Sequence, residues 1–166
     1  MASPSLTQSQ LKELLHYDPD TGVFTNLVTR NRGALIGNQA GYLTPKGYVI
    51  ISIKRIKYQA HRLAWFYVYG VWPIKQLDHI NRIKNDNCIF NLREATISQN
   101  HQNIQLQSNN TSGCKGVSWR KDINKWYVRI YLNREQIIIG YFKFLPDAIA
   151  ARKQAEEQLH THRIVA

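Results

Sequence analysis

A segment in the middle of the chain combines side chains that could hydrolyse a phosphodiester bond. Asp78 and His79 are neighbours, and Asn91 and Asn100 follow at wide intervals. Such hydrolysis needs a base that takes a proton from water and a cation that stabilises charge on the phosphate. The imidazole of His79 could be the base, while Asp78 and Asn100 offer the hard oxygen ligands that Mg²⁺ prefers. The alternative is a chance Asp-His pair followed by an Asn-rich turn.

The pattern around these residues predicts the elements that would bring them together. We expect a strand at 76–80, a polar loop at 81–89, a second strand at 92–95 and a helix from 96 onward. Residues 96–99 have the spacing of a capping box, which favours a helix that carries Asn100 in its first turns. Asn91 stands at the loop exit, where its side chain could bond to loop backbone. Adjacent strand residues point to opposite sides, so Asp78 and His79 should face different surroundings.

The overall composition favours a folded protein with an anionic partner. The chain has 166 residues, and 43% of them are hydrophobic, which is enough to bury a core. Lys and Arg number 22 against 11 Asp and Glu, giving a net charge of +11 and a pI of about 9.8. Nucleic acid is the first partner that this excess indicates, an anionic membrane surface is the second, and a basic protein without such a partner is the third reading.

The two cysteines and the N-terminal sequence indicate the cellular compartment of the protein. Cys88 and Cys114 form no CxxC pair, which excludes a four-cysteine zinc site, and two thiols suit a reducing cytosol. The N-terminus lacks the basic region and apolar core of a signal peptide, and no apolar run approaches membrane-spanning length. We therefore expect a soluble intracellular protein.

Four blocks between residues 61 and 103 resemble the HNH endonuclease family, in the ββα-metal form common in bacteriophage and intron-associated homing enzymes. The blocks are HRLAWFYVYGVWP, LDHINRIKNDN, NLREAT and SQN, and they follow the family's order and spacing. The resemblance implies that His79 is the general base and that Asn91 completes the catalytic set by bracing the loop. It also implies that Asp78 and Asn100 are the metal ligands.

Two positions in these blocks bear on the cofactor and on the surroundings of the site. The third motif position is Asn100 rather than His, which is the HNN variant and favours a hard, Mg²⁺-like cation over zinc. We expect Mg²⁺ as the cofactor, with Mn²⁺ able to substitute. His61 lies in the first block, where it either supports the fold or lies near the scissile phosphate. The supporting role is favoured, and His61 is a possible neighbour of the active site.

The C-terminal part has the period-two pattern of three short strands and then a helix. The strands are expected at GVSWR, KWYVRIYL and QIIIGYF, and the helix near Pro146. One side of the second strand should pack on the helix and consists of Trp126, Val128, Ile130 and Leu132. The other side has Arg129 between Tyr127 and Tyr131, which suits a DNA groove, with the Arg available for guanine or phosphate. A plain solvated face is the alternative.

This part also resembles the Apetala-type DNA-binding domain, a three-stranded antiparallel sheet that is backed by one helix and enters the major groove. The Gly-Val start, the Lys-Trp at the second strand, the Gly-x-Phe that ends the third and the Ala-rich helix carry the likeness. The family's strand-borne Arg and Trp residues are only partly present, so its plant target is not carried over. Trp119 and Trp126 are expected in the core. Alternation and resemblance together predict DNA contacts from Lys115, Ser118, Arg120, Arg129, Tyr131 and Gln136.

We predict an α+β protein that consists of a ββα-metal HNH nuclease module followed by a three-stranded antiparallel sheet packed on one helix. The expected divisions are a lead-in helix and strand at 1–45, the nuclease domain at 46–104, a linker at 105–113 and the Apetala-type domain at 114–162. The lead-in helix should lie within SLTQSQLKELL, with Thr7 or Ser9 as its cap.

The expected function is metal-dependent hydrolysis of phosphodiester bonds in duplex DNA by a free-standing homing endonuclease. The alternatives are a DNA-binding regulator with an inactive nuclease module, and a restriction or repair nuclease with the same chemistry. The expected partner is double-stranded DNA, with no membrane association, in the cytoplasm of a bacterium or a phage-infected host cell. A monomer is favoured over a dimer because the sequence has no convincing dimer seam.

Overall fold

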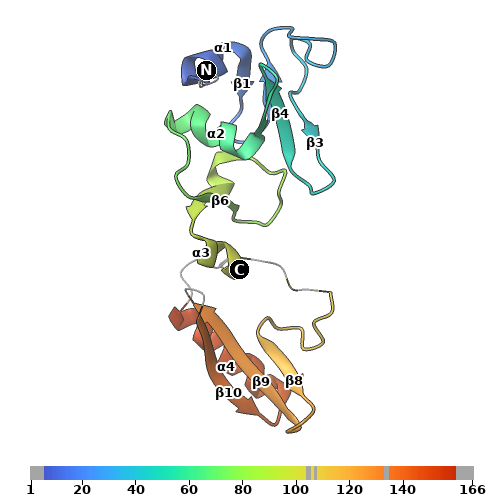
Figure 1. The fold of residues 1–166 in the computed structure, drawn as a ribbon, viewed down its shortest axis with the longest axis vertical. Coiled ribbons are helices and arrows are strands. Elements are labelled where there is room, and N and C mark those ends of the chain that lie inside the picture. Colours follow the sequence, from blue (N-terminus) through green and yellow to red (C-terminus); the bar gives the residue numbers. More distant parts are fainter. Residues whose placement is uncertain (1–5, 104–105, 107, 133–134, 160–166) are drawn as a thin grey trace. The chain divides into compact units, whose positions relative to one another are not determined.

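The computed structural model describes residues 6–103, 106, 108–132 and 135–159, and the chain divides into two compact units, Met1–Glu94 and Ala95–Ala166. Small sheets and few helices make up both units, so the expected mixed α/β class is confirmed (Figure 1). The finer domain limits predicted from the sequence stay predictions. Among the described residues, no helix combines the length and the apolar character that crossing a lipid bilayer requires.

The first unit begins with helix α1 (Gln8–Leu14), which Thr7 caps. The Thr7 hydroxyl accepts the backbone N–H of Gln10 at 3.2 Å, and the Gln10 side chain accepts the Thr7 N–H in return. This reciprocal pair satisfies two donors that a helix start leaves without an intrahelical partner. Strands β1 (Leu15–Tyr17) and β2 (Phe24–Asn26) follow and pair antiparallel. The lead-in therefore contains the expected helix and a short two-stranded sheet.

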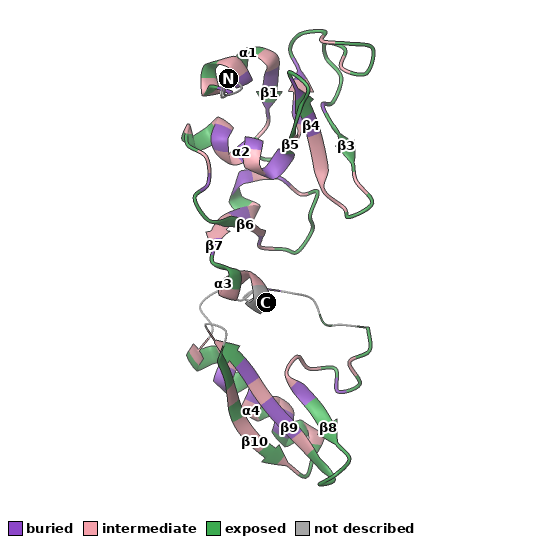
Figure 2. Cartoon of the chain, in the orientation of Figure 1, coloured by how far each residue is buried: buried purple, intermediate pink, exposed green. Residues whose placement is uncertain are grey.

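A three-stranded sheet supports the second helix of this unit. It consists of β3 (Tyr42–Leu43), β4 (Val49–Ile53) and β5 (Ile56–Gln59), and helix α2 (Ala60–Tyr69) packs against β4 and β5. The helix ends at Gly70, whose φ of 73° lies in the left-handed region that glycine adopts at little cost. Buried residues, purple in Figure 2, gather on α2 and its neighbours, and the largest fully buried apolar ones in this unit are Leu11, Leu15, Phe24, Ile51, Ile53 and Leu63.

A small two-stranded sheet carries the segment in which the sequence predicts chemistry. It pairs β6 (Gln76–His79) with β7 (Leu92–Ala95), and a short 3-10 helix, η1 (Ile89–Asn91), leads into β7. The loop between the strands is anchored to the lead-in, because the Ile89 N–H donates to the Pro19 carbonyl at 3.1 Å. The expected order of strand, polar loop and strand is confirmed.

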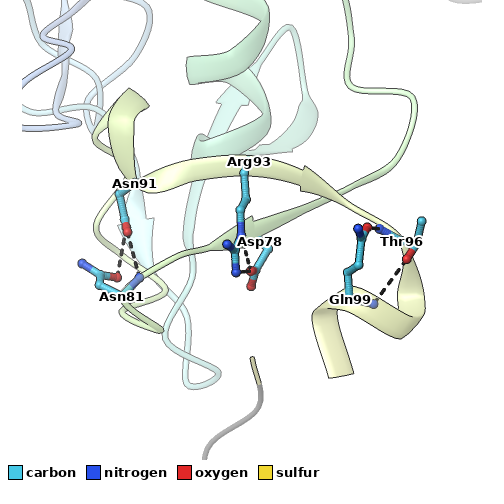
Figure 3. A network of polar contacts seen from close by, with 6 residues as sticks. All are labelled: Asp78, Asn81, Asn91, Arg93, Thr96 and Gln99. Carbon is cyan, nitrogen blue, oxygen red and sulfur yellow. Dashed lines mark hydrogen bonds and ion pairs between the residues drawn. The ribbon is translucent and has the colours of Figure 1, made fainter. Parts of the chain in front are cut away.

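Helix α3 (Ile97–Gln102) follows β7 and lies in the second unit. Thr96 is its N-cap, and its hydroxyl accepts the Gln99 N–H while the Gln99 side chain accepts the Thr96 N–H, at 3.2 and 2.8 Å (Figure 3). The capping box predicted from the spacing is therefore confirmed. Since α3 belongs to the second unit, the complete ββα-metal arrangement stays a prediction.

The second unit contains the predicted antiparallel sheet with a helix on one face. The strands β8 (Val117–Arg120), β9 (Lys125–Leu132) and β10 (Glu135–Phe142) are ordered β10-β9-β8, and helix α4 (Leu145–Leu159) packs against all three. On the predicted inner face of β9, Val128 and Ile130 are buried, while Trp126 and Leu132 are half-buried. The small core of this unit consists of Val117, Val128 and Ala148.

Two predictions about this sheet are wrong. Trp119 was expected in the core but is 40% exposed, because β8 is an edge strand and leaves one side of the indole uncovered beyond its edge-on contact with Trp126. Tyr127 was expected on an open face but is only 6% exposed. Its ring stacks on Tyr141 with centroids 5.2 Å apart, and the guanidinium of Arg129 lies 5.7 Å from its centroid. Large neighbours on the same face therefore cover this tyrosine.

Candidate active site

Strand β6 carries Asp78 and His79 into different surroundings, as alternation along a strand requires. The Asp78 side chain is 12% exposed and faces an arginine, whereas His79 is 6% exposed and faces other rings. The two neighbours therefore have different kinds of partner, a guanidinium in one case and aromatic rings in the other.

Arg93 on β7 is the partner of Asp78 (Figure 3). Its Nε and Nη2 atoms both donate to the Oδ2 oxygen of Asp78, at 3.0 and 2.9 Å. Charge-assisted bonds of this kind fix the orientation of a carboxylate and offset its charge in a partly buried place. Sequence reasoning missed Arg93. The available signal was the predicted pairing of the two strands, which puts residues 92–95 beside residues 76–79.

The side chain of Asn91 braces the loop between the two strands (Figure 3). Its Oδ1 atom accepts the backbone N–H of Asn81 at 3.0 Å, and its Nδ2 atom donates to the Asp86 carbonyl at 2.9 Å and to the Asn81 Oδ1 atom at 3.0 Å. One amide therefore connects the first residues of the loop to its far side. These are the backbone contacts expected from the position of Asn91, and its part in catalysis stays a prediction.

His79 is enclosed by one amide and two rings. Its Nε2 atom lies 3.3 Å from the Oδ1 atom of Asn87, and its ring centroid lies 5.0 Å from that of His61 and 6.2 Å from that of Tyr48. Burial lowers the pKa of His79 below its usual value, and the Asn87 hydrogen bond and the Asp78 charge oppose this only in part. The imidazole is therefore neutral near pH 7, the state in which it can accept a proton.

His61 packs edge-on against the His79 ring, and it is 6% exposed. Burial above all, and then the charges of His79 and Arg62, lower the pKa of His61 to about 3. Within the described part of the chain, its Nδ1 atom has no hydrogen-bond partner. The sequence left open whether this residue supports the fold or lies near the reacting groups. It is buried and in contact with the ring of the predicted base, and the choice between the two roles stays a prediction.

The donor atoms of the predicted metal site are oxygens. Asp78 supplies a carboxylate and Asn100 an amide oxygen, and this set suits a hard cation such as Mg²⁺ better than zinc. Across residues 6–103, 106, 108–132 and 135–159, His, Cys, Asp and Glu side chains form no group of three or more that could hold a metal ion. Mg²⁺ usually takes only one or two protein groups and completes its shell with water and phosphate oxygens. Asn100 lies on α3 in the second unit, so its pairing with Asp78 stays a prediction.

A network of Arg, Tyr and Gln side chains covers the outer face of β9 and β10. The Oε1 atom of Gln136 accepts from Arg129 Nη1 at 3.2 Å and from the Tyr131 hydroxyl at 2.6 Å, while its Nε2 atom donates to the Tyr127 hydroxyl at 2.8 Å. The guanidinium of Arg129 lies 5.7 Å from the ring centroids of both tyrosines. These contacts hold a cationic group and polar groups in fixed positions on an outer sheet face.

The remaining predicted DNA-contacting residues lie on or beside β8. Ser118 and Arg120 are exposed, and Lys115, just before the strand, is partly exposed. Arg120 donates two hydrogen bonds to the carboxylate of Asp122, at 2.9 and 2.7 Å. An exposed ion pair of this kind contributes little to stability and can be exchanged for another anion. DNA contact by these residues stays a prediction.

Comparison with known proteins identifies the segment that carries the site. Residues 58–102 match the family model described as HNH endonuclease. The matched stretch includes β6, β7 and α3, and the match supports an HNH nuclease family for this part of the chain. The homing subtype and the Apetala-type module lie outside what it covers.

A curated relative matches a similar fraction of the chain. Protein 3.8 of Escherichia phage T7 is 38% identical over 50 residues, which are 30% of this chain and 41% of that protein. The chain thus matches less than half the length of this relative. No solved structure matches the chain.

Replacing His61 by Phe should make the protein less sensitive to acid. Because the folded state holds the pKa of His61 at about 3, below the usual 6.5, the unfolded state binds the proton first as the pH falls. Stability that is fully present above pH 6.5 is therefore lost progressively between pH 6.5 and 3. Urea unfolding at about pH 7 and about pH 5 should show a loss roughly 2 kcal/mol smaller in His61→Phe than in wild type.

The matched control for this measurement is the exposed His16. His16→Phe removes the same imidazole from the surface, so its loss of stability between the two pH values should equal that of wild type. Equal losses in wild type and in His61→Phe would contradict the account of a buried neutral His61.

Proposed function

We propose that the protein is a metal-dependent endonuclease that hydrolyses phosphodiester bonds of duplex DNA. The observation that supports this best is the buried, neutral His79 beside the carboxylate of Asp78, within the segment that matches the HNH endonuclease model. The net charge of +11 supports an anionic polymer as the substrate, since Lys and Arg bind phosphates with an affinity that falls steeply as salt rises.

The proposed reaction begins with proton transfer from water to His79. The water oxygen forms a bond to phosphorus and the bond from phosphorus to the 3′ oxygen breaks, which leaves a 5′-phosphate and a 3′ oxygen that takes up a proton to become a hydroxyl. Asp78 and Asn100 would hold Mg²⁺ or Mn²⁺, and the cation would stabilise negative charge on the phosphate and on the leaving oxygen. Arg93 fixes the orientation of Asp78, and Asn91 holds the loop that follows His79.

The outer sheet face of the second unit is the proposed DNA-contacting surface. Arg129 is held there between tyrosines and Gln136, and a guanidinium fixed in this way suits phosphate oxygens or the edge of guanine. This is the role of the Apetala-type module in the proposal. The full set of proposed contacts is Lys115, Ser118, Arg120, Arg129, Tyr131 and Gln136.

The proposed biological role is that of a free-standing homing endonuclease that acts as a monomer in the cytoplasm of a bacterium or a phage-infected cell. The chain carries a nuclease segment and a separate basic sheet. This supports a division of tasks in which the first cuts DNA and the second positions it. The partial likeness to a phage protein supports the setting. A single nuclease site per chain would cut one strand in each event.

Supercoiled plasmid DNA tests the proposed chemistry. Wild type, His79→Ala and the surface control His16→Ala are each incubated with Mg²⁺, with Mn²⁺ and with EDTA, and the products are separated on a gel. Wild type and His16→Ala should convert the plasmid to relaxed circles with either metal and not with EDTA. Loss of the base should slow the reaction by about a hundredfold or more. A wild type that shifts DNA but never cuts it, or an equally fast His79→Ala, would contradict the proposal.

The sheet surface is tested by binding to a mixed-sequence duplex in EDTA, where no cleavage should occur. Arg129→Gln should weaken binding by about tenfold and should lower the salt slope by about one if its contact is to phosphate. Lys153→Gln on α4 removes the same charge from an exposed position and should bind like wild type. Equal losses in both variants would mean that net charge alone, and not this face, determines the affinity.

A further inference from the structure

Asn87 lies in the loop between β6 and β7 and uses both ends of its side-chain amide. It is 2% exposed. Its Oδ1 atom lies 3.3 Å from His79 Nε2, and its Nδ2 atom donates to the Asn85 carbonyl, also at 3.3 Å. A buried amide with a partner at each end has one preferred orientation, because turning it over would bring two acceptors together at Asn85.

That orientation decides which nitrogen of His79 carries the hydrogen. The Asn87 oxygen can only accept, so the His79 Nε2 atom must donate and must be protonated. A neutral imidazole has one N–H and one lone pair, so the lone pair belongs to Nδ1. The hydrogen bond therefore selects one tautomer of the ring, in which Nδ1 is the basic atom.

The backbone of Asn87 is held in place from the lead-in of the first unit. The hydroxyl of Tyr17 on β1 donates to the Asn87 carbonyl at 2.8 Å. Gly22, with a φ of +71°, lies so close that a Cβ atom added there would be 2.3 Å from the carbonyl carbon of Asn87. The amide that faces His79 is thus fixed by residues about seventy positions away in the sequence, as well as by its own loop.

We propose that Asn87 is a positioning residue that holds His79 in the tautomer with the proton on Nε2, so that Nδ1 takes the proton from the attacking water. The proposal rests on the proposed nuclease function of the same site, and it assigns to Asn87 a role separate from that of Asn91. Asn91 holds the backbone of the loop, whereas Asn87 sets the state of the ring itself.

Long-range ¹H–¹⁵N NMR of the ¹⁵N-labelled full chain tests the tautomer of His79 and does not depend on nuclease activity. Long-range ¹H–¹⁵N correlations distinguish a protonated from an unprotonated ring nitrogen, and comparison with His79→Gln assigns the signals. Wild type should have the proton on Nε2 at neutral pH. Asn87→Ala removes the acceptor oxygen and should give a mixture of the two neutral tautomers. A wild-type ring with its proton on Nδ1 would overturn the proposal.

Single-turnover nicking of plasmid DNA tests the consequence for the rate. At saturating protein, Asn87→Ala should be slower by at least about tenfold, as is usual when the partner that orients a functional imidazole is removed. DNA affinity should not change in this variant. Ile83→Ala, an exposed change in the same loop, is the matched control and should cut like wild type.

The two readouts separate the possible failures. An Asn87→Ala variant with the wild-type tautomer and the wild-type rate would overturn the proposal, and so would a changed tautomer with an unchanged rate. A wild type that cuts no DNA with any metal would instead refute the proposed function, while the NMR spectrum would still decide whether Asn87 sets the His79 tautomer.

Discussion

The side-chain amide of Asn91 is the interaction on which the rest of the site depends. The loop between β6 and β7 is polar and mostly exposed, so apolar burial does little to order it. Asn91 orders the loop instead through hydrogen bonds to Asn81 and Asp86, which lie on opposite sides of the loop. The next residue after Asp86 is Asn87, which meets the imidazole of His79. Loop closure and the state of the predicted base are therefore linked through consecutive residues.

The alternation of a single strand separates two electrostatic environments. Asp78 faces Arg93, which donates two hydrogen bonds to its carboxylate, and His79 enters a buried group of rings, which favours the neutral imidazole. The ring of His61 packs against the His79 ring, and burial holds the pKa of His61 well below its usual value as well. In the proposed mechanism, one of these adjacent residues is a metal ligand and the other is the base.

Local features of the fold could be predicted from the sequence, because each has a short-range cause. The capping box at Thr96, the end of α2 at Gly70 and the strands at β6 and β7 follow from residue types a few positions apart. Which side chains are buried on the outer face of β9 and β10 was less predictable. Tyr127 is buried because of the side chains from neighbouring strands, which period-two alternation does not describe.

The surroundings of the predicted base could not be derived from local pattern. His79 contacts Tyr48 on one sheet and His61 on α2, and Tyr17 on β1 fixes the Asn87 backbone. These residues are brought together by packing in the core of the first unit, and their spacing in the sequence carries no sign of it. The residue types and the family resemblance predicted the roles of His79 and Asp78. The hydrogen bond between Asn87 and His79 became visible only in the structure.

The central claim is that a loop closed by Asn91 holds the base in its working position. The most direct test is the single-turnover nicking rate of Asn91→Ala beside wild type, at saturating protein and with Mg²⁺. The account predicts a rate lower by at least about tenfold with unchanged DNA affinity, because the change loosens the loop and removes no DNA contact. A variant that binds and cuts like wild type would contradict the claim.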